Sequence, residues 1–181
     1  MHTVLRLLTL ALLSLPTMST AQGTVSSSAL AFIEAGISVA RAALGGGDVL
    51  TVGEAKSKGV SVDECRFEHI ASPGVTVLLG RCASMRATLV LEVTADASDA
   101  RAADLPTGLR YGMSPSEVVE RLGPPSADRA QIAGLQGLST AAVGDTDLYY
   151  VSEPKAADSK AVEISFERGR LVRVRWLLGP A

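Results

Sequence analysis

Apolar and polar residues alternate most regularly near the end of the chain, on both sides of Gly169. Before this glycine, apolar residues alternate with glutamate or serine: Val162, Glu163, Ile164, Ser165, Phe166 and Glu167. After it, valine and tryptophan alternate with arginine: Val172, Arg173, Val174, Arg175 and Trp176. A period of two residues is typical of a strand with one buried face. The pattern therefore predicts a β-hairpin with one apolar face and one charged face.

The length of the connecting loop decides how the two strands of this hairpin pair. A two-residue loop would place Ile164 opposite Arg173, which conflicts with a buried apolar face. A three-residue loop that ends with Gly169 in the left-handed conformation removes this conflict. It predicts that Ile164 faces Val172 and that Glu163 faces Arg173 across the hairpin.

A short helix with explicit start and stop signals is predicted after Gly112. Ser114 can accept a hydrogen bond from the amide of Glu117, and the Glu117 side chain can accept one from the amide of Ser114. Gly123 can end the helix in the left-handed conformation. The residues that define this structural motif, together with the hairpin glycine, are Gly112, Met113, Ser114, Glu117, Gly123 and Gly169.

The first half of the chain contains a similar order of elements. Apolar residues with helical spacing predict a helix over residues 29–44, which either lies in the core or docks onto a partner. Thr51 and Glu54 then repeat the capping pattern 63 residues before the second capped helix. The match indicates either an internal duplication or a chance similarity.

Two cysteines, Cys65 and Cys82, flank a turn signal at Pro73-Gly74. If these two residues form the loop of a hairpin, Cys65 lies directly opposite Cys82, and Phe67 lies opposite Gly80. This register predicts a disulfide between the cysteines. A free reactive thiol or a metal site is the alternative, but it lacks a second thiol pair or a histidine cluster.

Further strands are predicted over residues 86–94 and 147–151, a short helix over residues 126–132 and a loop over residues 133–145. Each half then consists of helices followed by about three antiparallel strands, which is an α+β fold with the helices on one side of a meander. The predicted organisation is a signal peptide (1–21), an N-terminal α+β half with the hairpin disulfide (22–95), a linker (96–104) and a second α+β half (105–181).

The signal peptide is predicted from a thin charged region at His2 and Arg6, an apolar run over residues 7–15, and small residues before Gln22. An uncleaved anchor is the alternative. After cleavage we expect no stable membrane span and a periplasmic or secreted protein. No cysteine follows the apolar run, so attachment of a lipid at that place is not expected.

The composition narrows the classes of partner. The net charge is −2, from 17 basic and 19 acidic residues, which does not indicate a partner among nucleic acids. Hydrophobic residues make up 47% of the chain but aromatic residues only 4%, so a largely aliphatic core is expected.

No catalytic, metal or cofactor motif is found in the sequence. The mature chain would keep one histidine, His69, which lies on a predicted strand and faces Leu78 in the hairpin register. A structural histidine is favoured there over a general base, because a triad would also need a suitably placed serine and carboxylate. We therefore expect a protein that is not an enzyme and has no cofactor.

The predicted site is a surface for another protein. Arginine and aromatic residues are typical anchors of protein interfaces, and the candidates for partner contacts are Tyr149, Tyr150, Arg173, Arg175 and Trp176. In the alternative interpretation, Trp176 and one tyrosine belong to the core, and the arginines only pair with Glu163 and Glu167.

The capped helix at residues 112–125 and the strand pair that contains residues 166–174 resemble the SmpA/OmlA (BamE-like) repeat. That repeat is similar to the fold of the β-lactamase-inhibitory proteins, a helical hairpin on a small antiparallel sheet. The resemblance covers residues 105–176 and has only a suggestive counterpart in the first half. It implies an exported, non-enzymatic module that binds a periplasmic or outer-membrane protein.

The two related groups imply different roles. BamE-type proteins assist outer-membrane barrel assembly, but they are lipoproteins, and this chain lacks the acylated cysteine. The inhibitory proteins are soluble, have two tandem repeats with disulfides, and hold an enzyme against the face of the sheet. We therefore expect an inhibitor or immunity protein for a secreted or periplasmic enzyme, and the alternative is a component of envelope assembly or an envelope scaffold.

Overall fold

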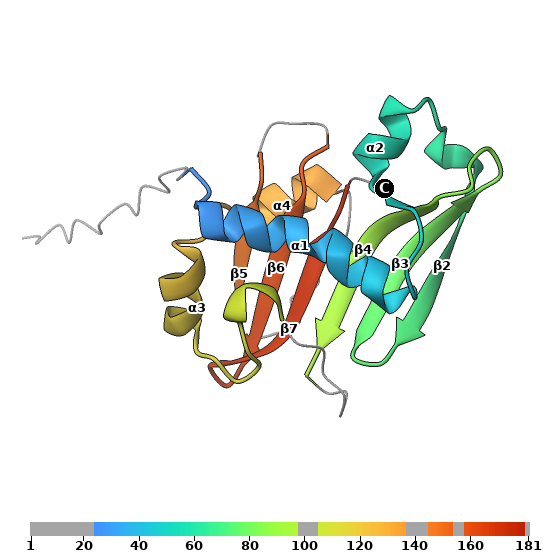
Figure 1. Ribbon diagram of the computed structural model, residues 1–181. Helices are drawn as coiled ribbons and strands as arrows, with labels where there is room; N and C mark the ends of the chain where they lie inside the picture. The colour runs from blue at the N-terminus through green and yellow to red at the C-terminus, as the bar shows by residue number, and fades with distance from the viewer. Residues whose placement is uncertain (1–23, 98–104, 137–144, 154–157, 180–181) are drawn as a thin grey trace, which may run out of the picture.

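In the part of the chain that the structure describes, seven strands form one mixed sheet, and helices pack on it (Figure 1). The computed structural model describes residues 24–97, 105–136, 145–153 and 158–179. The helices are α1 (Ser27–Ala43), α2 (Val52–Ser57), α3 (Pro115–Leu122) and α4 (Arg129–Gln136), with 3-10 turns η1 (Val62–Glu64) and η2 (Pro106–Gly108). The strands are β1 (Val49–Leu50), β2 (Cys65–Ser72), β3 (Val75–Cys82), β4 (Thr88–Asp96), β5 (Thr146–Val151), β6 (Ala161–Glu167) and β7 (Arg170–Leu177). The predicted α+β class is confirmed.

The two predicted halves contribute to the same sheet. Its strand order is β2-β3-β4-β7-β6-β5, and the short β1 pairs in parallel with β4. Each half has a capped helix before an antiparallel three-stranded meander, and the last strands of the two meanders, β4 and β7, pair antiparallel at the centre. The predicted linker begins inside β4, because that strand continues through Asp96; residues 98–104 and the predicted signal peptide lie outside the described residues.

The main core lies between α1 and one face of the sheet. Phe32 of α1 packs against Trp176 of β7 with ring centroids 5.3 Å apart, and the Trp176 indole donates a hydrogen bond to the Phe32 carbonyl at 2.9 Å. Gly36 allows this approach, because a Cβ at that position would lie 2.6 Å from Trp176 Cγ. The helix expected at residues 29–44 is therefore a core helix.

Helices cover both faces of the sheet, so the expectation that they lie on one side was wrong. On the face opposite α1, Ile132 of α4 packs with Tyr149 and Leu177. Val52 of α2 packs with Leu89 of β4 on that same face. Helix α4 also extends into the region predicted as a loop over residues 133–145, while residues 137–144 lie outside the described residues.

The capped helix α3 begins and ends as predicted. The Ser114 hydroxyl accepts a hydrogen bond from the amide of Glu117 at 3.3 Å, and the Glu117 carboxylate accepts one from the amide of Ser114 at 2.7 Å. Gly123 ends the helix with φ 84°. Main-chain hydrogen bonds between the Gly112-Met113 segment and Leu171 attach the start of α3 to β7. The same reciprocal cap is present in α2, between Thr51 and Glu54.

The first predicted hairpin, with its disulfide, is confirmed. Strands β2 and β3 pair with Cys65 opposite Cys82 and Phe67 opposite Gly80, and the two cysteines form a disulfide. The Phe67 ring covers Gly80, where an added Cβ would lie 2.8 Å from the ring. The glycine is therefore required by the aromatic side chain above it.

The register predicted for the last hairpin was wrong. Strands β6 and β7 are connected by a two-residue turn, Arg168-Gly169, in which both residues have positive φ (50° and 70°). An irregularity between Ser165 and Phe166 then shifts the pairing, so that Ile164 faces Val174 and Glu163 faces Arg175. A bulge in the strand, and not a longer loop, removes the conflict between Ile164 and an arginine.

Candidate functional site

Polar side chains form a continuous group on the sheet face opposite α1. Strands β4, β7, β6 and β5 bring them together by register, although they come from segments far apart in the sequence. We call this group the polar face; its members are Glu92, Thr94, Asp96, Asp147, Tyr149, Glu163, Ser165, Arg173 and Arg175. Alternate residues of the same strands point into the α1 core, as the period-two pattern requires.

Arg175 lies at the centre of the polar face. Its guanidinium contacts the carboxylate of Glu92 at 2.7 Å and that of Glu163 at 3.3 Å. Burial disfavours the charged guanidinium, but the hydrogen bonds and charges of the two carboxylates outweigh this and raise the pKa of Arg175. Burial also raises the pKa of Glu163, and the opposing effect of Arg175 does not cancel it. Arg175, Glu92 and Glu163 therefore form a buried group of ion pairs that connects three strands.

Tyr149 extends the network towards β5. Its hydroxyl lies 3.4 Å from a carboxylate oxygen of Asp147 and 3.4 Å from one of Glu163, so it can donate its proton to either. Burial and the two nearby negative charges raise the pKa of Tyr149, so the phenol stays protonated at neutral pH. Tyr149 serves as a hydrogen-bond donor between two acids.

Arg173 is the accessible cation of the polar face. Its guanidinium contacts Asp96 through two nitrogens, at 2.6 and 2.8 Å, and the two side chains are 32% and 27% exposed. A guanidinium held in this way has few conformations to lose when a partner binds, and it keeps further N–H groups towards solvent. Arg173 is thus the best placed of the predicted contact residues.

Some buried polar atoms of this face have no hydrogen-bond partner. They are Asp147 Oδ1, Ser165 Oγ and Arg175 Nε, and in the described part of the chain nothing donates to or accepts from them. Unused acceptors and donors of this kind are satisfied by water or by another molecule. The polar face therefore has hydrogen-bonding capacity beyond its own ion pairs.

The five predicted contact residues do not lie together. Tyr149, Arg173 and Arg175 belong to the polar face, but Tyr149 is buried there against α4, and Tyr150 and Trp176 are buried on the α1 side, so none of the three aromatic residues can be a surface contact. The Tyr150 hydroxyl donates to the Gly123 carbonyl at 3.0 Å, and burial raises the pKa of Tyr150 to about 12. The alternation of Val172, Val174 and Trp176 contained this signal, because residues two apart share one face.

Sequence reasoning also missed the partners of the arginines. It proposed Glu163 and Glu167, but besides Glu163 the acids are Glu92 and Asp96 of β4. These residues are separated from β7 by about half of the chain, and no local pattern indicates that β4 and β7 pair.

The same sheet face continues to the outer strand β2 with fewer charges. Phe67 is 46% exposed, and His69, Ala71 and Thr76 on β2 and β3 are exposed as well. His69 lies opposite Leu78, as predicted. Because neighbouring strands lie about 4.8 Å apart, the face measures about 14 Å from β2 to β7. An apolar anchor and a charged anchor thus lie on one surface, with Thr76, Leu78 and Glu92 among the residues between them.

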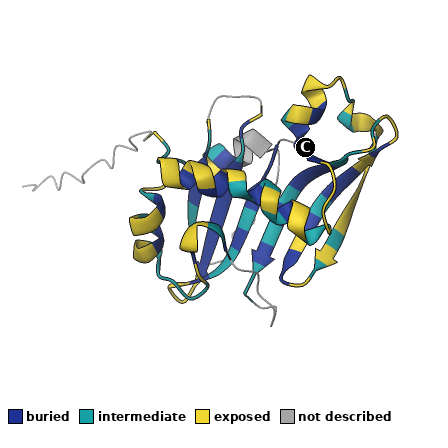
Figure 2. Cartoon of the chain, viewed as in Figure 1, coloured by how far each residue is buried: buried dark blue, intermediate teal, exposed yellow. Residues whose placement is uncertain are grey.

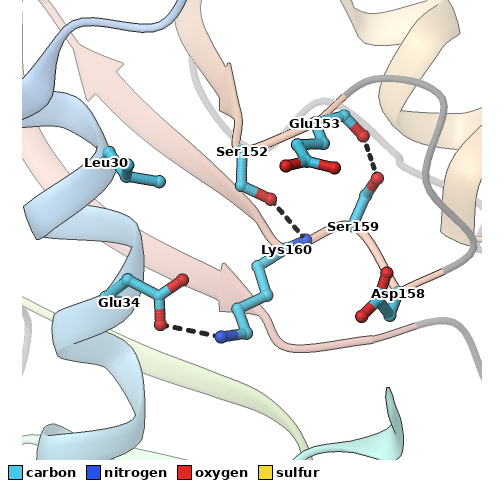
Figure 3. Close-up of a pocket in the computed structure, with 7 residues that line it drawn as sticks. All are labelled: Leu30, Glu34, Ser152, Glu153, Asp158, Ser159 and Lys160. Atoms are coloured by element: carbon cyan, nitrogen blue, oxygen red, sulfur yellow. Dashed lines mark hydrogen bonds and ion pairs between the residues drawn. The ribbon is translucent and has the colours of Figure 1, made fainter.

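A separate shallow pocket of about 350 Å³ lies between α1 and the connection of β5 to β6 (Figure 3). Its polar groups largely bind one another: Lys160 contacts Glu34 at 2.7 Å, the Ser152 hydroxyl accepts a bond from the Lys160 amide, and the Ser159 hydroxyl donates to the Glu153 carbonyl. The remaining residues that line it are Leu30 and Asp158. In the described ranges, no group of three or more metal-ligating side chains is found here or elsewhere.

None of the helices in the described ranges is both long and apolar enough to cross a membrane. No protein-family model, no curated protein and no solved structure matches this chain. The resemblance to the BamE-like repeat therefore stays a prediction.

Proposed function

We propose that this protein is an exported, non-catalytic module that binds and inhibits an enzyme of the same compartment through the sheet face formed by β2, β3, β4 and β7. The observation that carries the proposal is the Arg173–Asp96 pair, which holds a partly exposed guanidinium in place on a rigid sheet. Arginine held in this way is typical of residues that dominate binding energy.

The positions of the two anchors on the face support this role. Phe67 and Arg173 lie on strands separated by β3 and β4, and the residues between them include Thr76 and Thr94. A stable interface buries about 800 Å² on each partner. In this proposal, Phe67 and Arg173 anchor the partner across the four strands, beside α2 and α4, which pack on the same face.

The disulfide supports export. A disulfide between Cys65 and Cys82 is compatible with an extracellular or periplasmic location, because such bonds persist in oxidising compartments. Together with the predicted signal peptide, this favours a partner that is itself exported.

The test is capture followed by inhibition. The mature protein, residues 22–181, is immobilised and exposed to the exported proteins of its own source, and each captured protein is then titrated with soluble bait while its enzymatic activity is followed. We expect loss of activity at a stoichiometric ratio. Arg173→Ala should weaken binding about 30-fold, as for an interface hot spot, and Thr76→Arg should block the middle of the face.

A matched control is Arg110→Glu, which changes an exposed arginine outside the sheet. If Arg173→Ala and Thr76→Arg bind as tightly as the unchanged protein, the proposed face is wrong. If the captured protein is an outer-membrane or assembly component that keeps its activity, the result favours the alternative of an assembly or scaffold role.

A further inference from the structure

Strand β2 is one edge of the sheet, and in the described ranges no strand pairs with its outer side. Figure 2 shows most of this strand as exposed, in contrast to the buried strands at the centre. An edge of eight residues presents unpaired amide and carbonyl groups that can pair with another chain. The outward main-chain groups and the side chains of β2 determine which strand can pair with this edge.

The geometry of the hairpin identifies the residues whose main-chain groups point outward. The two-residue turn at Pro73-Gly74 makes Ser72 and Val75 a hydrogen-bonded pair, and the type of pair then alternates along the ladder. The Cα distance of 4.0 Å between Cys65 and Cys82 is that of a pair without hydrogen bonds, as this alternation requires. The outward groups therefore belong to four residues: Cys65, Phe67, His69 and Ala71.

We propose that β2 pairs antiparallel with β2 of a second copy of this chain, on a two-fold axis at Phe67. Outward residues must face outward residues, so the axis of such a pairing passes through a single residue. Phe67 then faces Phe67 of the second copy, and Arg66 faces Glu68 on both sides of the axis. The strand is thus complementary in charge to itself in this register.

Other registers lack this complementarity. An axis at Arg66 brings two arginines face to face, and an axis at Glu68 brings two glutamates face to face, both of which are unfavourable. An axis at His69 places Glu68 opposite Ile70. Only the axis at Phe67 pairs each charged residue of the strand with an opposite charge.

The charges within one copy also favour a second copy. Arg66 lies directly opposite Arg81 of β3, and none of the ion pairs between described residues includes Arg66. Glu68 contacts Arg81 at 2.5 Å, and both side chains are exposed. In the dimer, Glu68 would lie between Arg81 of its own chain and Arg66 of the second copy, so the like-charged arginines would alternate with carboxylates.

This dimer would join two sheets into one, independently of the proposed inhibitory function. A two-fold axis through an antiparallel strand pair runs perpendicular to the sheet, so the polar faces of both copies would lie on the same side. The assembly would present two copies of the Arg173–Asp96 pair on one surface, and it would bind a dimeric or repeated partner with two sites at once.

The experiment is a charge exchange measured by sedimentation equilibrium of the mature protein over a range of concentrations. We expect the wild-type protein to form a dimer. Arg66→Glu and Glu68→Arg should each raise the dissociation constant of the dimer about tenfold, because each replaces two attractive pairs with two repulsive ones. The double variant Arg66→Glu plus Glu68→Arg should restore dimerisation, since it exchanges the charges and keeps their complementarity.

A second variant tests the main-chain pairing. His69→Pro removes an outward N–H but no hydrogen bond of the β2–β3 ladder. It should therefore abolish the dimer, while the monomer stays folded and still unfolds cooperatively on heating. Arg110→Glu and Arg173→Ala should leave the dimer unchanged, which separates this proposal from the inhibitory function. A monomeric wild-type protein, single variants that dimerise as the wild type does, or a double variant that dimerises as weakly as the single variants would each overturn the pairing.

Discussion

Replacing Arg175 by methionine tests whether the polar face is held together by its buried ion pairs. The substitution keeps a long side chain but removes the charge that faces Glu92 and Glu163. Their side chains are 16% and 2% exposed, so water cannot fully replace the guanidinium, least of all at Glu163. Removing one partner of a buried pair costs about 3–5 kcal/mol. Because Glu92 is slightly hydrated, we expect about 3 kcal/mol.

The loss of stability caused by Arg175→Met should depend on pH. Burial raises the pKa of Glu163 already with Arg175 present, and removing the arginine raises this pKa further. A carboxyl whose pKa is higher in the folded than in the unfolded state stabilises the fold when it is protonated, and this contribution is lost as the pH rises through the folded-state pKa. The loss of unfolding free energy in Arg175→Met should therefore be small at about pH 4 and largest at about pH 7. These two pH values lie on either side of the range in which Glu163 loses its proton.

Urea unfolding at both pH values measures this difference. Trp176 is the only tryptophan and is fully buried, so its fluorescence reports on unfolding. The double variant Arg175→Met plus Glu163→Gln should recover more than half of the loss at pH 7, because the uncompensated charge is gone. A deficit that is equal at both pH values, or a double variant as unstable as the single one, would refute the argument.

Three other predictions concern single elements of the fold. Gly36→Ala should destabilise the protein by about 1 kcal/mol or more, despite the better helix propensity of alanine, because the new methyl group meets Trp176; an increase in the melting temperature would contradict this. Removing the disulfide with Cys65→Ser plus Cys82→Ser should cost about 3 kcal/mol for a loop of this length, and alkylation without reductant should add no mass to the unchanged protein. Ser114→Ala should cost about 1 kcal/mol through loss of the α3 cap, measured in urea, and an unchanged midpoint would show that the cap contributes nothing.

Local signals were sufficient for the elements that depend on neighbouring residues. The cap of α3 needs only Ser114 and Glu117, three residues apart, and both hydrogen bonds are present. The register between Cys65 and Cys82 followed from the position of a two-residue turn and is confirmed. In both cases, the groups that decide the geometry lie within one turn or one hairpin.

The sequence was insufficient where two solutions satisfy the same pattern. The conflict between Ile164 and Arg173 can be removed by a longer loop or by a bulge in the strand, and the apolar pattern is the same for both. The left-handed conformation of Arg168, a residue that is not glycine, favours the two-residue turn in the structure but carries no sequence signal. Likewise, the pairing of β4 with β7 joins distant segments, so the acids that bind the arginines could not be identified.

The two interpretations of the arginines in β7 are not exclusive, because burial separates the residues. Arg175 is enclosed by two carboxylates, so any change there alters stability and cannot report on binding alone. Arg173 forms an ion pair with Asp96, and about a third of its side chain stays exposed. A truncation at Arg173 removes only a partly hydrated ion pair, which is worth at most about 1 kcal/mol in the free protein. A large loss of affinity in that variant, with little loss of stability, would therefore measure a direct contact with the partner.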